Sequence, residues 1–263
     1  MQETFYRLPN FPLRRIALAS DLHNHPFEEA LDSLAQRRPQ LIAIPGDLFL
    51  GAQPKGEELV ALTQEHVLPF LRACSALAPT FLSLGNHEWM LVPEDLALLK
   101  STGAVLLDSA YAVLCIGGNR IIVGGLTSVA VTSCRVFRHN CGPNAPRYPV
   151  KNRYFHFKAP RRFWLQRFEA QPGYHILLSH HPEYYPTYLA HRPIELILSG
   201  HAHGGQWRFL DRGLFCPGQG LFPPLTSGVV DQRLVISRGL SNHSFIPRIN
   251  NPPEMVYIEG EYE

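Results

Sequence analysis

Five short apolar runs, each followed at once by a polar side chain or glycine, most constrain how this 263-residue chain can fold. The runs occupy residues 15–20, 40–45, 80–84, 174–179 and 194–199. Their length and apolar composition are typical of buried strands. Apolar residues at helical spacing predict helices at residues 27–35, about 57–72 and 93–100. Alternating strands and helices predict an α/β fold with a largely parallel central sheet.

The pattern changes after Ala104, where three strands are predicted with no helix between them. They occupy residues 104–108, 112–117 and 120–127, and a Gly-Gly-Asn turn indicates a hairpin in a second or mixed sheet. Residues 131–162 are basic and aromatic and show no clear period, which predicts an irregular insertion. A short helix at 160–170 and one strand at 233–237, within a Gly- and Pro-rich end, complete the expected elements. Because no repeat or linker interrupts the chain, we expect residues 1–263 to form a single domain.

Composition predicts a cytoplasmic protein. The five cysteines are scattered and form no CxxC pair, which predicts reduced thiols. No apolar run is long enough to span a bilayer, and residues 1–15 lack the apolar core of a signal peptide. The net charge is only +2, yet residues 131–168 carry nine Lys or Arg and no Asp or Glu. This basic segment predicts either an anionic partner or a solvated loop that balances acidic neighbours.

Side chains that can bind metals stand at the carboxyl ends of all five predicted strands. The loops at these ends of an α/β sheet converge on one point. Taken singly, each residue has an ordinary explanation: Asp21 as a helix cap, Asp47 as a turn residue and Asn86 as a left-handed residue. The coincidence of five such strand ends instead predicts a metal site.

The same residues form blocks that resemble, in order, the motifs of the calcineurin-like metallophosphoesterases. The blocks are Asp21-x-His23, Gly46-Asp47, Gly85-Asn86-His87-Glu88, His180 and Gly200-His201-x-His203. The continuation at residues 204–206 resembles a bacterial subgroup whose last block reads GHTHGGQ, and residues 237–240 and 252–254 are similar to that subgroup too. The resemblance covers about residues 14–258 and implies a four-layer α/β/β/α sandwich of two packed mixed sheets flanked by helices.

The resemblance also implies a dinuclear metal centre. One metal would be held by Asp21, His23, Asp47 and His203, and the other by Asp47, Asn86, His180 and His201. His181 is next to His180 in the sequence, but successive strand residues face opposite ways and the family pattern favours His180 as the ligand. Imidazole ligands favour Mn or Fe, with Zn as an alternative. The implied reaction is hydrolysis of a phosphomono- or phosphodiester by a metal-bridging hydroxide.

The chemistry explains why such a site needs two metals. A pair of cations about 3.5–4 Å apart neutralises the ester's charge and lowers the pKa of a bridging water from about 15.7 towards 7. By resemblance, His87 contacts the phosphate and protonates the leaving oxygen. Asn86, His25 and His243 are further expected substrate contacts, and Gln206 has no assigned role.

Three classes of function compete on the sequence. A phosphoesterase acting on a small molecule or a lipid head group is the first interpretation. A nuclease of the same superfamily is the second, because the basic and aromatic residues 131–162 could stack on bases and contact phosphates. A non-catalytic metal-binding scaffold is the third and is disfavoured because no expected ligand is missing. Residues 46–51 lack the GDxxDRG continuation of protein Ser/Thr phosphatases. We expect no transmembrane segment, while residues 131–162 could contact a membrane surface peripherally.

Overall fold

Two six-stranded mixed sheets form the centre of the protein in a computed structural model. The structure describes residues 1–50, 63–141, 160–209, 212–216, 219–242 and 246–260. The first sheet has the order β1 (Gln2–Leu8), β16 (Glu254–Gly260), β2 (Arg15–Leu18), β3 (Ile42–Ile44), β4 (Thr80–Leu82) and β5 (Val105–Leu106). The second has the order β14 (Gly228–Val230), β15 (Leu234–Ile236), β9 (Leu196–Ser199), β8 (Tyr174–Ser179), β7 (Asn119–Leu126) and β6 (Ala110–Ile116).

Each sheet is parallel at its centre. Strands β2 to β5 run parallel to one another, and β16 pairs with β2 in the antiparallel direction. In the second sheet β7, β8, β9 and β15 are parallel, with β6 and β14 added antiparallel at the two edges. The parallel strands of one sheet therefore all end on the same side, which is where the candidate site lies.

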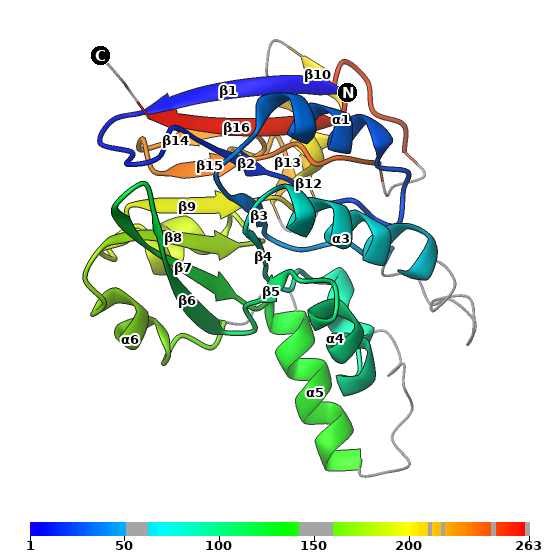
Figure 1. Cartoon of the computed structure of the whole chain (residues 1–263). Coiled ribbons are helices and arrows are strands. Elements are labelled where there is room, and N and C mark those ends of the chain that lie inside the picture. Colours follow the sequence, from blue (N-terminus) through cyan, green and yellow to red (C-terminus); the bar gives the residue numbers. More distant parts are fainter. Residues whose placement is uncertain (51–62, 142–159, 210–211, 217–218, 243–245, 261–263) are drawn as a thin grey trace.

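Alternation of side chains along each strand builds three apolar layers. In β2, Ile16 and Leu18 face the second sheet, while Ala17 faces the helices α1 (Glu28–Arg37) and α3 (Leu68–Leu77). In β8, Ile176 faces the first sheet and Leu177 faces the outer layer around α6 (Leu165–Glu169). Figure 1 shows α1 and α3 beside the first sheet and α6 beyond the second. The predicted α/β/β/α sandwich is confirmed, since both faces of both sheets are covered.

Most predicted helices are present, with shifted bounds. Helix α1 and helix α4 (Pro93–Lys100) lie where the sequence predicts them. The helix expected at about 57–72 is observed as a short π-helix, η1 (Thr63–Val67), that continues directly into α3, and residues 57–62 lie outside the described part. Pro69 falls in the first turn of α3, where its missing N–H has no intrahelical acceptor to lose.

The prediction of an irregular segment at 131–162 is wrong at its start. Helix α5 (Val129–Cys141) extends through residues 131–141 and projects away from the two sheets (Figure 1). It packs against the short turn η2 (His87–Met90), so this part of the chain supports the site. Residues 142–159 lie outside the described part.

The chain ends contribute strands that the sequence did not predict. Strands β1 and β16 pair in parallel although they lie near opposite ends of the sequence. The register runs from Gln2 opposite Glu254 to Leu8 opposite Gly260. Two small hairpins are also unpredicted, formed by β10 (Arg208–Phe209) with β11 (Arg212–Gly213) and by β12 (Phe215–Cys216) with β13 (Gly220–Leu221). Cys74, Cys115, Cys134 and Cys216 form no disulfide. Within the described residues, no helix combines the length and the apolar character that crossing a bilayer requires.

Candidate metal centre

The carboxyl ends of strands from both sheets bring the predicted site residues together. Asp21 and His23 follow β2, Asp47 follows β3, Asn86 and His87 follow β4, His180 follows β8, and His201 and His203 follow β9. The pairing of β2 with β3 continues past the strand ends, because Asp21 N donates to Gly46 O at 3.2 Å and His23 N donates to Asp47 O at 3.2 Å. All these side chains are buried except His87, which is partly exposed.

Asp21, His23 and His203 form a first cluster. The Nε2 atoms of His23 and His203 lie 3.8 and 3.6 Å from Asp21 Oδ1, and 3.3 Å from each other. His23 Nδ1 lies 2.9 Å from Phe49 O, so a proton on Nδ1 is donated to that carbonyl and the Nε2 lone pair faces the cluster. One nitrogen or oxygen from each residue lies within 4.8 Å of the others, a spacing that suits one metal ion.

Asp47, His180 and His201 form a second cluster with the same spacing. His180 Nε2 lies 3.0 Å from Asp47 Oδ2. Asn86 Oδ1 is buried and has no hydrogen-bond partner among the described residues. A buried carbonyl oxygen without a partner is rare, and a cation would satisfy it. Carboxylate, imidazole and amide oxygen together fit a first-row transition metal.

His87 lies at the partly exposed edge of the clusters. Its backbone N–H donates to Asp47 Oδ1 at 2.8 Å, and its Nδ1 lies 2.7 Å from Leu50 O. Its Nε2 lies 3.7 Å from Asp47 Oδ2, and His23, Asp47 and His87 also meet the spacing of a metal site. The geometry therefore permits both a contact to substrate and a contact to metal for this histidine.

The backbone at the centre is held in a conformation that costs energy. Five of the predicted residues have φ between 46° and 67°: Asp21, His23, Asp47, His201 and His203. L-residues other than glycine rarely adopt this left-handed region, and such strain of about 1–3 kcal/mol per residue clusters at functional sites. The strained backbone therefore lowers the stability of the fold while it directs these side chains toward one point.

Two glycines make room for the carboxylates. A Cβ on Gly85 would lie 2.2 Å from Asp47 Oδ1, and a Cβ on Gly200 would lie 2.3 Å from Asp21 Oδ2. Gly200 does not have a positive φ, so the close approach of Asp21 explains the glycine at this position. Gly205 does have a positive φ of 78°, and a Cβ there would meet the backbone of Gly213 at 2.4 Å.

Glu88 is an organising residue to which the sequence analysis gave no role. Its buried carboxylate accepts backbone N–H groups from Asp47 at 2.9 Å, Leu48 at 2.8 Å and Gly85 at 2.6 Å. It therefore ties the loop after β3 to the loop after β4. Burial and the nearby Asp47 carboxylate raise the pKa of Glu88 to about 7, against the effect of the N–H donors. The sequence did carry a signal for this role, because an acidic residue directly follows the pair Asn86-His87.

Electrostatics favour the ionised form of Asp47, and burial favours the neutral form of His201 and His203. Burial alone raises the pKa of Asp47, but His180 and His87 hold it well below its usual value. Burial lowers the pKa of His201 and of His203. Burial also lowers the pKa of His180, but the Asp47 carboxylate outweighs it and raises that pKa to about 9. Metal binding at His180 thus requires the loss of a proton, as is usual for metal ligands.

The remaining predicted residues lie around this centre. His181 Nε2 lies 2.8 Å from Ser128 Oγ, so it is directed differently from His180. His25 is half-buried, and burial together with His23 lowers its pKa. His243 lies outside the described residues. Gln206 is buried with a φ of 56°, and its backbone carbonyl accepts from Asn251 Nδ2 at 3.1 Å, which assigns it a place in the turn after His203.

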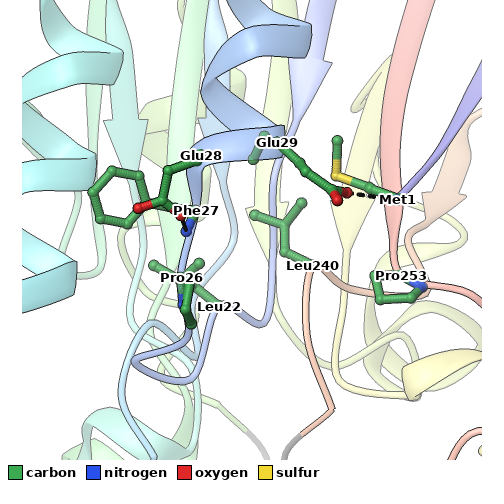
Figure 2. A pocket seen from close by; sticks show the side chains of 9 residues that line it. Met1, Leu22, Pro26, Phe27, Glu28, Glu29, Leu240 and Pro253 are labelled. Atoms are coloured by element: carbon green, nitrogen blue, oxygen red, sulfur yellow. Dashed lines mark hydrogen bonds and ion pairs between the residues drawn. The ribbon is translucent and has the colours of Figure 1, made fainter.

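A separate pocket of about 250 Å³ opens beside the start of α1 (Figure 2). Most of its lining residues are apolar, and the full lining is Met1, Leu22, Pro26, Phe27, Glu28, Glu29, Ala30, Leu240 and Pro253. The N-terminal ammonium of Met1 donates to Glu29 Oε2 at 2.6 Å on one side of it. Leu22 lines this pocket, while its neighbours in the sequence, Asp21 and His23, belong to the first cluster. The pocket is therefore close to the candidate metal centre along the chain but contains none of its predicted residues.

A comparison with known protein families shows to which family the chain belongs. The family model described as calcineurin-like phosphoesterase matches residues 14–205, which is most of the chain. The chain belongs to the calcineurin-like phosphoesterase family. The match includes all seven predicted metal ligands, from Asp21 to His203, and His87.

Several known proteins resemble this chain at low sequence identity. This calcineurin-like phosphoesterase is 23% identical over 245 residues to the uncharacterised protein YpbG of Bacillus subtilis (strain 168), covering 92% of this chain and 79% of that protein. It shares its fold with a dimetal phosphatase from Danio rerio at 14% identity and a TM-score of 0.51, covering 87% and 88% of the two chains. A 5'-nucleotidase precursor from Thermus thermophilus matches at 19% identity and a TM-score of 0.48; the match covers 86% of this chain and 49% of that longer chain.

Proposed function

We propose that this calcineurin-like phosphoesterase is a dinuclear metal-dependent hydrolase of phosphomono- or phosphodiesters. The observation that carries the proposal is the position of Asp47. Its carboxylate belongs to one group of potential ligands with His180 and His201 and to another with His23 and His87. Two cations that lie close together need a shared anionic ligand, and the membership of Asp47 in both groups supports this role for it. The first cluster, Asp21 with His23 and His203, completes the ligands on one side.

In this proposal the residues of the chain divide the work. Asp21, His23, Asp47 and His203 hold one cation, and Asp47, Asn86, His180 and His201 hold the other. Mn²⁺ and Fe²⁺ or Fe³⁺ are the proposed metals, with Zn²⁺ as an alternative. When bound, the cations would offset the charge of the phosphoester and acidify the attacking water.

We assign His87 to the leaving group. Its Nδ1 is held 2.7 Å from Leu50 O, which fixes the ring and leaves Nε2 as the atom directed at substrate. In the protonated ring both nitrogens are donors, so Nε2–H can protonate a leaving alkoxide while Nδ1–H stays on the carbonyl. The partial exposure of His87 supports the role, because a proton donor must reach the substrate and be reloaded from solvent.

A screen with metal-reconstituted protein tests the proposal. Purified full-length protein is stripped of metal, reloaded with Mn²⁺, Fe²⁺ or Zn²⁺, analysed for metal content, and assayed on phosphomonoesters, phosphodiesters, nucleotides and single-stranded DNA. We expect about two metals per chain and hydrolysis of at least one class of ester. Activity on DNA alone would favour a nuclease, and bound metals with no activity on any ester would favour a scaffold.

We also propose a cytoplasmic location. Cys74, Cys134 and Cys216 are buried and form no disulfide, and this supports the proposal because reduced thiols persist in reducing compartments. Fractionation of the source cells tests the location, and recovery of the protein from an extracytoplasmic fraction would contradict it.

A further inference from the structure

Arg248 lies beside the first cluster and was not among the predicted site residues. Its Nη2 lies 3.0 Å from His203 Nδ1 and also donates to Ser241 O. Ser241 in turn is bound to the Asp21 backbone, because both its N–H and its hydroxyl donate to Asp21 O, at 3.1 and 2.9 Å. The guanidinium is therefore fixed next to the residues proposed to hold one metal.

The guanidinium of Arg248 is buried, and two of its nitrogens have no hydrogen-bond acceptor among the described residues. Arg248 Nε and Nη1 are both inaccessible to solvent and have no hydrogen-bond partner among the described residues. Burial lowers its pKa to about 10, which leaves the side chain charged at neutral pH. A buried charge without hydrogen bonds is costly, so an unpaired one at a candidate active site indicates a missing partner.

The described part of the chain does not supply that partner. None of the ion pairs found there includes Arg248. Glu254 could be considered as an acidic partner for Arg248, but it is already bound to Arg238. The Nη2 atom of Arg238 lies 2.9 Å from Glu254 Oε1. Asp21 accepts the backbone N–H of His201 at 3.1 Å and faces the two histidines of the first cluster. The missing partner must therefore come from beyond these described residues, and the place of Arg248 beside the first cluster favours the substrate.

The contact to His203 adds a second reason for a missing anion. A guanidinium only donates, so His203 Nδ1 must accept and the proton of the neutral ring is on Nε2. Yet Nε2 is the atom that faces Asp21 and His23. A neutral imidazole has one lone pair, so His203 cannot accept from Arg248 and bind a cation through Nε2 at the same time. When the cation is bound in this way, Nη2 loses an acceptor as well.

We propose that Arg248 binds a non-bridging oxygen of the phosphoryl group of the substrate. This inference rests on the proposed function and adds to it a cation supplied by the chain. A guanidinium suits a tetrahedral oxyanion because its N–H groups form several charge-assisted hydrogen bonds in fixed directions. Oxygen atoms of a phosphoryl group at the metal centre would supply the acceptors that Nε and Nη1 lack.

Phosphate binding by the metal-loaded protein tests the proposal directly. Inorganic phosphate is titrated calorimetrically into Mn²⁺-loaded full-length wild type, Arg248→Gln, Arg248→Lys and Arg7→Gln, with Mn content measured on the same samples. Arg7 is exposed and its ion pair with Glu259 is long, at 3.9 Å, so Arg7→Gln controls for the loss of one positive charge. We expect Arg248→Gln to weaken phosphate binding by about 10- to 100-fold, Arg248→Lys to weaken it less, and Arg7→Gln to change little.

Two results would overturn the assignment. Unchanged phosphate affinity in Arg248→Gln at equal Mn content would remove Arg248 from the binding site, and loss of Mn in both Arg248 variants would make it a support for His203 instead. If Arg248→Gln does not fold, Arg248→Lys decides the question. Wild-type phosphate affinity in Arg248→Lys would show that the planar guanidinium is not needed and would refute the assignment. Wild type that binds phosphate through Arg248 yet hydrolyses no ester would refute the proposed function and leave the anion site standing.

Discussion

Replacement of Glu88 should destabilise the two loops that carry the candidate metal centre without removing any proposed ligand. In Glu88→Ala, the backbone N–H groups of Asp47, Leu48 and Gly85 lose their common acceptor in a buried place. An unsatisfied buried donor costs about 1–3 kcal/mol, so the three together should lower the free energy of unfolding by about 3–6 kcal/mol once some water enters. That is a large part of the roughly 5–15 kcal/mol that stabilises a typical domain.

The isosteric variant Glu88→Gln separates shape from hydrogen bonding. One amide oxygen still accepts, but the NH2 group then faces a backbone donor, and the loss should be about 1–3 kcal/mol. Urea unfolding followed by tryptophan fluorescence in the presence of a chelator measures both variants without the contribution of bound metal. Metal content after reloading should fall in the same order, because Asp47 and Asn86 are presented by the two loops that Glu88 joins.

An exposed glutamate supplies the control. Glu94 lies in the first turn of α4, and Glu94→Ala should change the free energy of unfolding by no more than about 0.5–1 kcal/mol. If Glu88→Ala were as stable as this control, the three N–H groups would have found other partners. The account of Glu88 as the tie between the two loops would then be refuted.

Three further predictions concern the metal centre itself. Asp47→Asn should abolish hydrolysis and lower metal content, because both proposed metals share Asp47; near-normal hydrolysis with full metal content would contradict this. His87→Ala should keep its metals while the rate of hydrolysis falls about 10²–10⁴-fold, least for aryl phosphates with good leaving groups; loss of metal would instead make His87 a ligand. In the metal-free protein, the pKa of His180 at about 9 lies above the ordinary 6.5, so the stability it provides is full below about pH 6.5 and is lost as pH rises towards 9. The urea midpoint should fall across that range, and it should fall less in His180→Gln; a flat wild-type profile would count against the Asp47–His180 ion pair.

Local pattern was enough for the central strands and for the candidate site residues at their ends. The centres of these runs, such as residues 176–178 and 196–198, are buried on both faces, so they are continuously apolar and stand out from the flanking polar residues. Strand β1 does not stand out, because it is an edge strand with an alternating, half-exposed pattern. Its partner β16 lies 252 positions away at the first paired residues, Gln2 and Glu254. No window of sequence contains both strands.

The sequence by itself determined the fold class and which residue types stand at the strand ends, because burial periodicity and residue type are local properties. The tertiary structure alone decided what surrounds them. Glu88 reaches the backbone of Asp47 across 41 positions, and Arg248 reaches His203 across 45. Such contacts depend on how separate loops meet in space, and neither residue type nor spacing encodes that meeting.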